Sequence, residues 1–159
     1  DSAGVVANDR GITVWLKGNR VSRNQIMAIK EESVTDQKNS LTVCLDNILR
    51  HAGITRNTEY DLAQGKTAIQ ILEENMTGVQ VLDLSGCSLD AVLYYVNQDI
   101  PVLAILEDGE AVLVTGFNEF NVVIMEPSTG KLYKKGMNDA TTWFAENGNH
   151  FISYMKIEN

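Results

Sequence analysis

The residue best suited to covalent chemistry in this sequence is Cys44, in the stretch QKNSLTVCLDNILRHAG from Gln37 to Gly53. This stretch predicts a loop that leads into a helix, with Cys44 near the first turn of that helix. A thiol at such a place lies close to backbone N–H groups and to the positive end of the helix dipole, and both favour the thiolate. A thiolate attacks carbonyl carbon, so Cys44 is a candidate nucleophile.

Gln37 could supply a second part of such a site. It precedes Cys44 by seven positions (44 − 37), and its side-chain amide could donate a hydrogen bond to an oxyanion. On its own, a glutamine in a loop is equally an ordinary polar surface residue. A thiol hydrolase also needs a group that takes the proton from sulfur and passes it to the leaving amine.

Two histidines have the right chemistry for that base, but neither has a favourable position. His51 follows Cys44 on the same expected helix, roughly 10 Å further along its axis, which is beyond hydrogen-bond reach. His150 stands beside the last expected strand, where a surface histidine is the simpler interpretation. Two interpretations remain for the second cysteine, Cys87: it is either a buried free thiol or the disulfide partner of Cys44. The cysteines and histidines are too scattered for a zinc pattern, and we expect no metal or cofactor.

The elements that position these residues fall into two groups along the chain. Apolar residues at helical spacing predict the helix of Cys44, two short helices after it, and a helix that carries Leu89, Val92, Leu93 and Val96. From Pro101 onward, short apolar runs separated by turn residues predict strands, with one short helix capped by Asn138 before the last strand. We therefore expect an α+β fold, in which N-terminal helices pack on a C-terminal antiparallel sheet.

The helix of Cys44 also has predictable ends. Ser40 or Thr42 can cap its N-terminus, and Gly53 can end it. Cys44 falls at the edge of the apolar stripe of this helix, so we expect a thiol half buried and half open to a cleft. The stripe consists of Leu41, Leu45, Ile48, Leu49 and Ala52.

Length and charge narrow the possible partners. A chain of 159 residues with 44% hydrophobic residues is the size of one domain, and we expect residues 1–34 to form a strand and arm that pack on a domain spanning 35–159. The net charge of −8 argues against nucleic acid and anionic membrane surfaces. No apolar run approaches the roughly 18 residues that span a bilayer, so no membrane insertion is expected. Modest lysine content and frequent Asn, Asp and Thr favour an extracytoplasmic protein, secreted or on the cell surface.

The order of these motifs resembles a known family. A glutamine before a cysteine helix, then Gly109-Glu110-Ala111-Val112, then Glu126-Pro127-Ser128-Thr129-Gly130, resembles the bacterial papain-like cysteine peptidases of the C39 and C39-like group over about residues 35–135. The resemblance implies that Cys44 stands at the nucleophile and Gln37 at the oxyanion position. It places Glu110 at the position of the basic histidine and Glu126 at that of the acid that orients it. The separations are 66 (110 − 44) and 16 (126 − 110) residues.

Two of these four positions depart from the family pattern. A carboxylate at position 110 has too low a normal pKa to hold the sulfur proton, and its charge disfavours the thiolate. Glu126 would be a second anion with no imidazolium to orient. The sequence therefore favours a catalytically degenerate domain over an enzyme, and we expect it to bind a peptide or protein segment or to contact neighbouring domains of a larger protein. The alternative is an active cysteine peptidase or acyltransferase that uses Cys44 and a base not recognised in the sequence.

Overall fold

A computed structural model describes residues 2–5, 12–14 and 39–157 of the chain. Gln37 and the stretch expected to form an arm lie outside these residues, and the division of the chain near residue 35 stays a prediction. The described helices are α1 (Ser40–His51), α2 (Glu59–Ala63), α3 (Ala68–Asn75), α4 (Leu89–Asn97) and α5 (Met137–Glu146). The described strands are β1 (Ser2–Val5), β2 (Ile12–Val14), β3 (Val79–Asp83), β4 (Val102–Ile105), β5 (Ala111–Phe117), β6 (Asn121–Glu126), β7 (Lys131–Gly136) and β8 (Phe151–Lys156).

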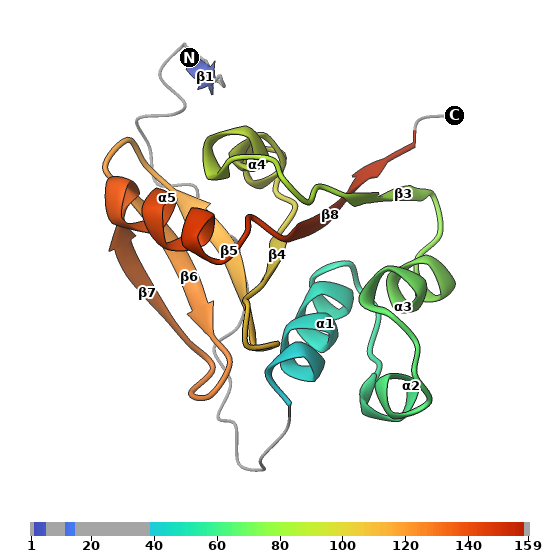
Figure 1. Cartoon of the computed structure of the whole chain (residues 1–159). Helices are drawn as coiled ribbons and strands as arrows, with labels where there is room; N and C mark the ends of the chain where they lie inside the picture. Colours follow the sequence, from blue (N-terminus) through green and yellow to red (C-terminus); the bar gives the residue numbers. More distant parts are fainter. Residues whose placement is uncertain (1, 6–11, 15–38, 158–159) are drawn as a thin grey trace.

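Six of these strands form one antiparallel sheet in the order β3-β8-β4-β5-β6-β7. β8 comes last along the chain, yet it lies between β3 and β4 and joins them (Figure 1). β1 and β2 form a separate two-stranded sheet. The predicted α+β class, with helices packed on an antiparallel sheet, is confirmed. The position of β8 inside the sheet has no counterpart in the sequence pattern.

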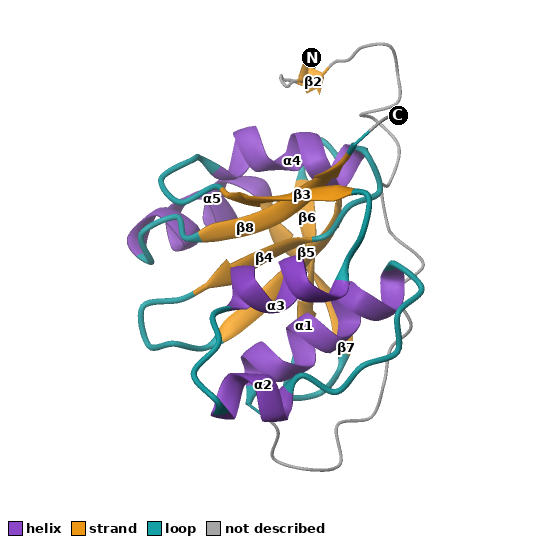
Figure 2. Ribbon diagram, turned by 90° about the vertical axis from the view of Figure 1, so that its right-hand side faces the viewer, coloured by secondary structure: helices purple, strands orange, loops and turns teal. Residues whose placement is uncertain are grey.

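Helices cover both faces of the large sheet, so the domain has three layers (Figure 2). Successive side chains of a strand point to opposite faces, and the buried strand residues divide accordingly. Val102 and Val112 join a cluster with α4 and α5, whereas Leu103 and Leu113 join a cluster with α1 and α3. Only the cluster with α1 and α3 contains Cys44.

The ends of α1 show which local signals can be read from sequence. Its N-cap is Asn39, whose side chain accepts a hydrogen bond of 2.7 Å from the Leu41 N–H, so the expectation of Ser40 or Thr42 as the cap is wrong. Gly53 ends the helix as predicted, with a φ of 88° that glycine adopts at little cost. The cap expected at Asn138 is also wrong, because α5 begins at Met137 and Asn138 lies inside it.

Candidate functional site

The N-terminal end of α1 is held directly against β5. The hydroxyl of Ser40 accepts a hydrogen bond of 2.8 Å from the backbone N–H of Ala111, a residue 71 positions away. Ser40 is free for this contact because Asn39 caps the helix. Cys44 follows Ser40 by about one turn and shares its core cluster with Ala111. The sheet therefore places Glu110, which precedes Ala111, beside the first turn of the cysteine helix.

Cys44 itself is fully buried, with 0% of its surface exposed. The expectation of a thiol half open to a cleft is therefore wrong. The side chain belongs to the same cluster of buried apolar residues as Leu45, Leu113 and Met125. Burial and, second, the charge of Glu126 raise the pKa of the thiol well above its ordinary value. Cys44 is thus protonated at neutral pH, although its helix position would by itself favour the thiolate.

Glu126 ends β6 and organises the turn that follows it. Its carboxylate oxygen Oε1 accepts hydrogen bonds of 3.2 Å from both the N–H and the hydroxyl of Ser128. Its carbonyl accepts a hydrogen bond of 2.8 Å from the Gly130 N–H and closes the turn. Glu126, at the expected acid position, is therefore close enough to Cys44 to raise the pKa of its thiol. Its oxygens also accept hydrogen bonds from the turn that follows it.

Glu110 is exposed at the start of β5, and its backbone completes the hairpin between β4 and β5. Its carbonyl accepts a hydrogen bond of 2.8 Å from the Leu106 N–H, and its N–H donates one of 2.9 Å to the carboxylate of Asp108. Of the positions predicted for the site, Glu126 is thus near Cys44, and Glu110 is next to Ala111, which binds Ser40 of α1. Their roles in any reaction stay predictions, and Gln37 lies outside the described residues.

Neither histidine lies at this junction. His51 is in the last turn of α1, and its Nε2 lies 3.1 Å from the carbonyl oxygen of Asp99 and 3.6 Å from Oδ2 of the same residue. His150 precedes β8, where its carbonyl accepts a hydrogen bond from the Ile105 N–H and its ring lies near Asp83. Among the described residues, no hydrogen bond joins either imidazole to Cys44.

The two cysteines are both free thiols, so the disulfide left open by the sequence does not form in this structure. Cys44 belongs to the cluster with α1 and α3, and Cys87 packs against the cluster on the opposite face of the sheet. Within the described ranges, no group of three or more His, Cys, Asp or Glu side chains could hold a metal ion. A search of the same ranges finds no helix long and apolar enough to cross a membrane.

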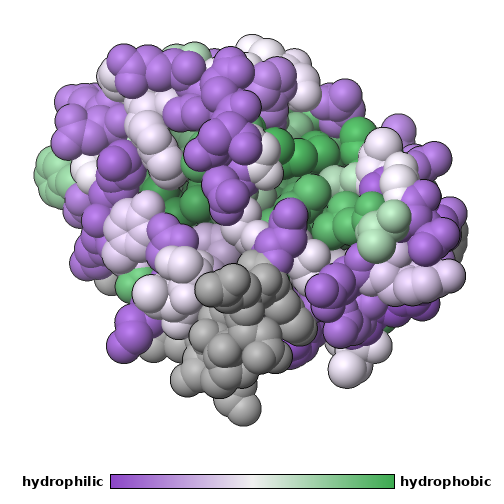
Figure 3. All heavy atoms as spheres, turned by 60° about the horizontal axis from the view of Figure 1, so that its bottom comes forward, coloured by the Kyte–Doolittle hydropathy of each residue, from purple (hydrophilic) through white to green (hydrophobic). Residues whose placement is uncertain are grey.

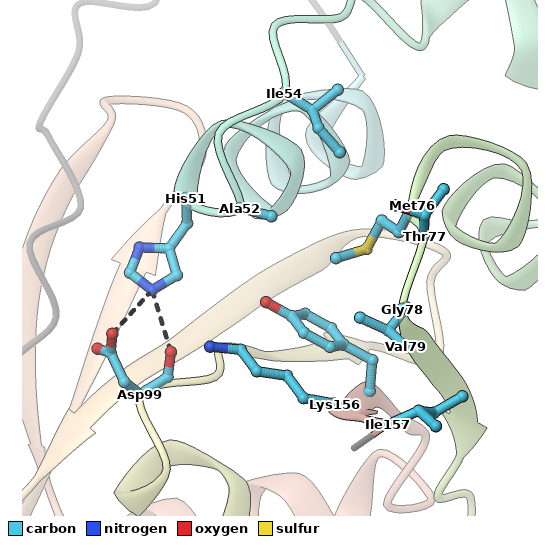
Figure 4. A pocket seen from close by; sticks show the side chains of 11 residues that line it. His51, Ala52, Ile54, Met76, Thr77, Gly78, Val79, Asp99, Lys156 and Ile157 are labelled. Atoms are coloured by element: carbon cyan, nitrogen blue, oxygen red, sulfur yellow. Dashed lines mark hydrogen bonds and ion pairs between the residues drawn. The ribbon is translucent and has the colours of Figure 1, made fainter. Parts of the chain in front are cut away.

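A pocket that the sequence analysis did not predict lies at the other end of α1. The pocket measures about 530 Å³ and lies between the C-terminus of α1, the turn after α4, and the paired ends of β3 and β8 (Figure 4). Figure 3 brings the bottom of the Figure 1 view forward. On that face, apolar side chains gather in a hollow between polar ones. The pocket joins residues that are far apart in sequence, and only the folded chain brings them together. The lining residues are His51, Ala52, Ile54, Met76, Thr77, Gly78, Val79, Asp99, Tyr154, Lys156 and Ile157.

Comparisons with known proteins support the fold and go no further. No protein-family model and no curated protein matches the sequence. Among solved structures, the chain is similar to a proposed C39-like peptidase from Bacillus anthracis, with a TM-score of 0.67 at 14% sequence identity. The match covers 84% of this chain and 98% of that one. The chain therefore has the papain-like fold of C39-like peptidases.

Proposed function

We propose that this chain is a non-catalytic papain-like domain that binds a peptide or protein segment along its former substrate cleft. The observation that carries the proposal is the state of Cys44, which is buried, protonated and close to the carboxylate of Glu126. A thiol peptidase needs an accessible thiolate and a base that returns the proton to the leaving amine. Here the position of the base carries Glu110.

The charge of the surface beside Cys44 supports a basic partner. The hairpin that leads into β5 exposes three carboxylates, those of Glu107, Asp108 and Glu110, and the whole chain carries a net charge of −8. Carboxylates of one sign on a surface attract a segment rich in Lys or Arg and speed its association at low salt. The partner is an extended basic peptide or a basic loop of a neighbouring domain, outside the cytoplasm.

The reactivity of Cys44 tests the non-catalytic part of this proposal. The native protein is treated with iodoacetamide at pH 7.5, and alkylation of each cysteine is followed by peptide mass mapping. Cys87 is the internal control because it is only partly buried. We expect Cys87 to react first and Cys44 to react only when the protein unfolds. Faster labelling of Cys44 than of Cys87, or peptide cleavage that Cys44→Ala abolishes, would instead support an active cysteine peptidase or acyltransferase.

Binding is tested with a library of fluorescent peptides of graded charge. We expect basic peptides to bind more tightly than acidic or neutral ones, and the triple variant Glu107→Gln, Asp108→Asn, Glu110→Gln to lose this preference. The matched control is Asp139→Asn, which removes one exposed carboxylate from α5. Equal binding of basic peptides to the wild type and the triple variant would contradict the proposed cleft.

A further inference from the structure

The pocket at the C-terminal end of α1 is separate from Cys44, which lies toward the other end of the same helix. Its volume of about 530 Å³ lies in the range of small-molecule sites, roughly 300–1,000 Å³. Apolar side chains from the ends of α1 and α3 and from β3 form part of its wall, and Figure 4 shows Ile54, Met76 and Val79 around the space. This wall suits an aliphatic or aromatic group of a ligand.

Two side chains that line the pocket, Tyr154 and Lys156, have no hydrogen-bond acceptor among the described residues. Tyr154 is only 3% exposed, and in the described part of the chain its hydroxyl makes no hydrogen bond. Burial and the nearby charge of Asp99 raise its pKa, so the hydroxyl keeps its proton and remains a donor. Lys156 lines the same pocket, and within the described ranges its ammonium forms no ion pair. The hydroxyl opens into the pocket, where it can donate a hydrogen bond to an acceptor such as a ligand carboxylate.

Asp99 adds a single negative charge to the same pocket. His51 donates to its backbone carbonyl at 3.1 Å, and His51, Asp99 and Lys156 meet on one side of the space in Figure 4. The carboxylate is 73% exposed, so it is accessible to a cation. It lies near the Tyr154 hydroxyl, whose pKa it helps to raise. The anionic and donor groups are therefore close enough to act on one small molecule.

The backbone conformation of Asp99 indicates that its carboxylate has a function. Asp99 has a φ of 67°, at the position just past a helix where α1, α2 and α5 carry Gly53, Gly65 and Gly148, all with positive φ. Its N–H and that of Ile100 close the end of α4 as in those helices. Glycine would adopt this conformation without strain, and a residue that keeps strain beside a pocket points to a use for its side chain.

We propose that this pocket binds the zwitterion of a free α-amino acid with an apolar side chain, such as leucine or phenylalanine. The ligand carboxylate accepts hydrogen bonds from the Tyr154 hydroxyl and the Lys156 ammonium. The ligand ammonium binds the carboxylate of Asp99, and the apolar side chain lies against Met76 and Val79. This assignment uses the Asp99 carboxylate, the Lys156 ammonium and the Tyr154 hydroxyl, and no covalent bond is made or broken.

Calorimetric titration with three isosteric probes tests the assignment. L-leucine carries both charges, 4-methylpentanoate lacks the ammonium, and 3-methylbutylamine lacks the carboxylate. We expect leucine to bind at least about tenfold more tightly than either probe, since each hydrogen bond to a charged group is worth roughly a factor of ten or more. Absence of saturable binding by leucine and phenylalanine, or equal affinity for leucine and either single-charge probe, would overturn the assignment.

Variants identify the contact that each charge makes. Lys156→Met and Tyr154→Phe should each lower the affinity for leucine by about tenfold. The affinity for 3-methylbutylamine should not change, because that probe has no carboxylate. Asp99→Asn should weaken leucine and leave 4-methylpentanoate unaffected, and asparagine tolerates the backbone conformation. The control Lys134→Met, on β7, should change no affinity. A variant that loses affinity equally for all three probes, with an unchanged melting temperature, would contradict the assigned contacts.

Discussion

Two opposing influences act on the Cys44 side chain, and their magnitudes decide its chemistry. A position near a helix N-terminus stabilises a negative charge by about 0.3–1 kcal/mol when exposed. Full burial in apolar surroundings shifts the pKa of an acidic group upward by up to about 3–5 units, and each unit corresponds to about 1.4 kcal/mol. Burial therefore outweighs the helix dipole, and the negative charge of Glu126 acts in the same direction.

The raised pKa of Cys44 predicts a specific loss of stability in base. Below about pH 8.5 the thiol is protonated in the folded and unfolded states, and its contribution is fully present. Above that pH the unfolded state releases the proton first, so the free energy of unfolding falls by up to about 1.4 kcal/mol per pH unit until the folded thiol ionises. Urea unfolding of the wild type and Cys44→Ala, under reducing conditions from pH 7 to 10, measures this difference.

We expect the wild type to lose stability more steeply than Cys44→Ala between about pH 8.5 and 10. Tyr95, Tyr133 and Tyr154 also have raised pKa values, with burial as the main cause, and they add a loss of the same sign at higher pH in both proteins. Parallel curves for the two proteins would show that Cys44 ionises equally in both states.

At the residue scale, the sequence predicted positions better than environments. The resemblance to C39-like peptidases placed Cys44, Glu110 and Glu126 at one site; in the structure Glu126 raises the pKa of the Cys44 thiol, and Ala111, next to Glu110, binds Ser40 of α1. The burial of Cys44 could not be predicted, because Leu113 and Met125, which pack around it, come from strands far along the chain. The roles of these residues stay predictions.

Among the elements, α4 has an unusual C-terminal end. The other helices with this type of end use glycine, and Asp99 replaces it at α4 with a φ of 67°. Replacing Asp99 by Gly should stabilise the fold by roughly 1 kcal/mol, because the strain at a positive φ is removed. For a chain of this size, that change raises the melting temperature by about 2–4 °C, which differential scanning calorimetry resolves.

The equivalent position of α1 provides the matched control. Gly53 has a φ of 88°, and a Cβ atom added there would meet no heavy atom within 4 Å. Gly53→Ala should therefore lower stability by roughly 1 kcal/mol through backbone strain alone. A destabilising Asp99→Gly would mean that the contacts of the Asp99 side chain outweigh the strain of its backbone.

The sequence predicted helices correctly where the apolar spacing and the capping residues lie within the helix and its immediate neighbours. The capping box of α3 is such a local signal: Thr67 accepts a hydrogen bond from the Gln70 N–H, and the Gln70 side chain accepts one from the Thr67 N–H. The cap of α1 was mistaken because Ser40 instead binds the N–H of Ala111 on β5. A serine and an asparagine in succession can each cap a helix, and only the distant strand decides between them.

At the scale of the whole molecule, the domain boundary can be tested directly. Residues 39–157 contain all six strands of the large sheet and the two clusters of buried residues that cover its faces. A fragment spanning residues 35–159 should therefore unfold in one cooperative transition, as monitored by circular dichroism in urea. A fragment without a cooperative transition would show that the preceding residues are part of the folding unit.

The fold class was predictable because the helical and strand patterns occur in separate parts of the sequence. The order of the strands was not, since the hydrophobic pattern of a strand does not identify its neighbours. Phe151 and Ile152 of β8 pair with Ala104 and Leu103 of β4, and nothing in their sequence distinguishes this partner from another buried strand. The pocket at the end of α1 depends on the pairing of β8 with β3 and was missed for the same reason.

The central position of β8 constrains how the domain folds as it is synthesised. β8 leaves the ribosome after all the other described strands, yet it is the strand that joins β3 to β4. Until it emerges, the nascent chain exposes the edges of β3 and β4, which are open to pairing with other chains. The domain therefore completes its sheet only after translation has passed Lys156, and a chaperone that covers exposed strand edges would act before that point.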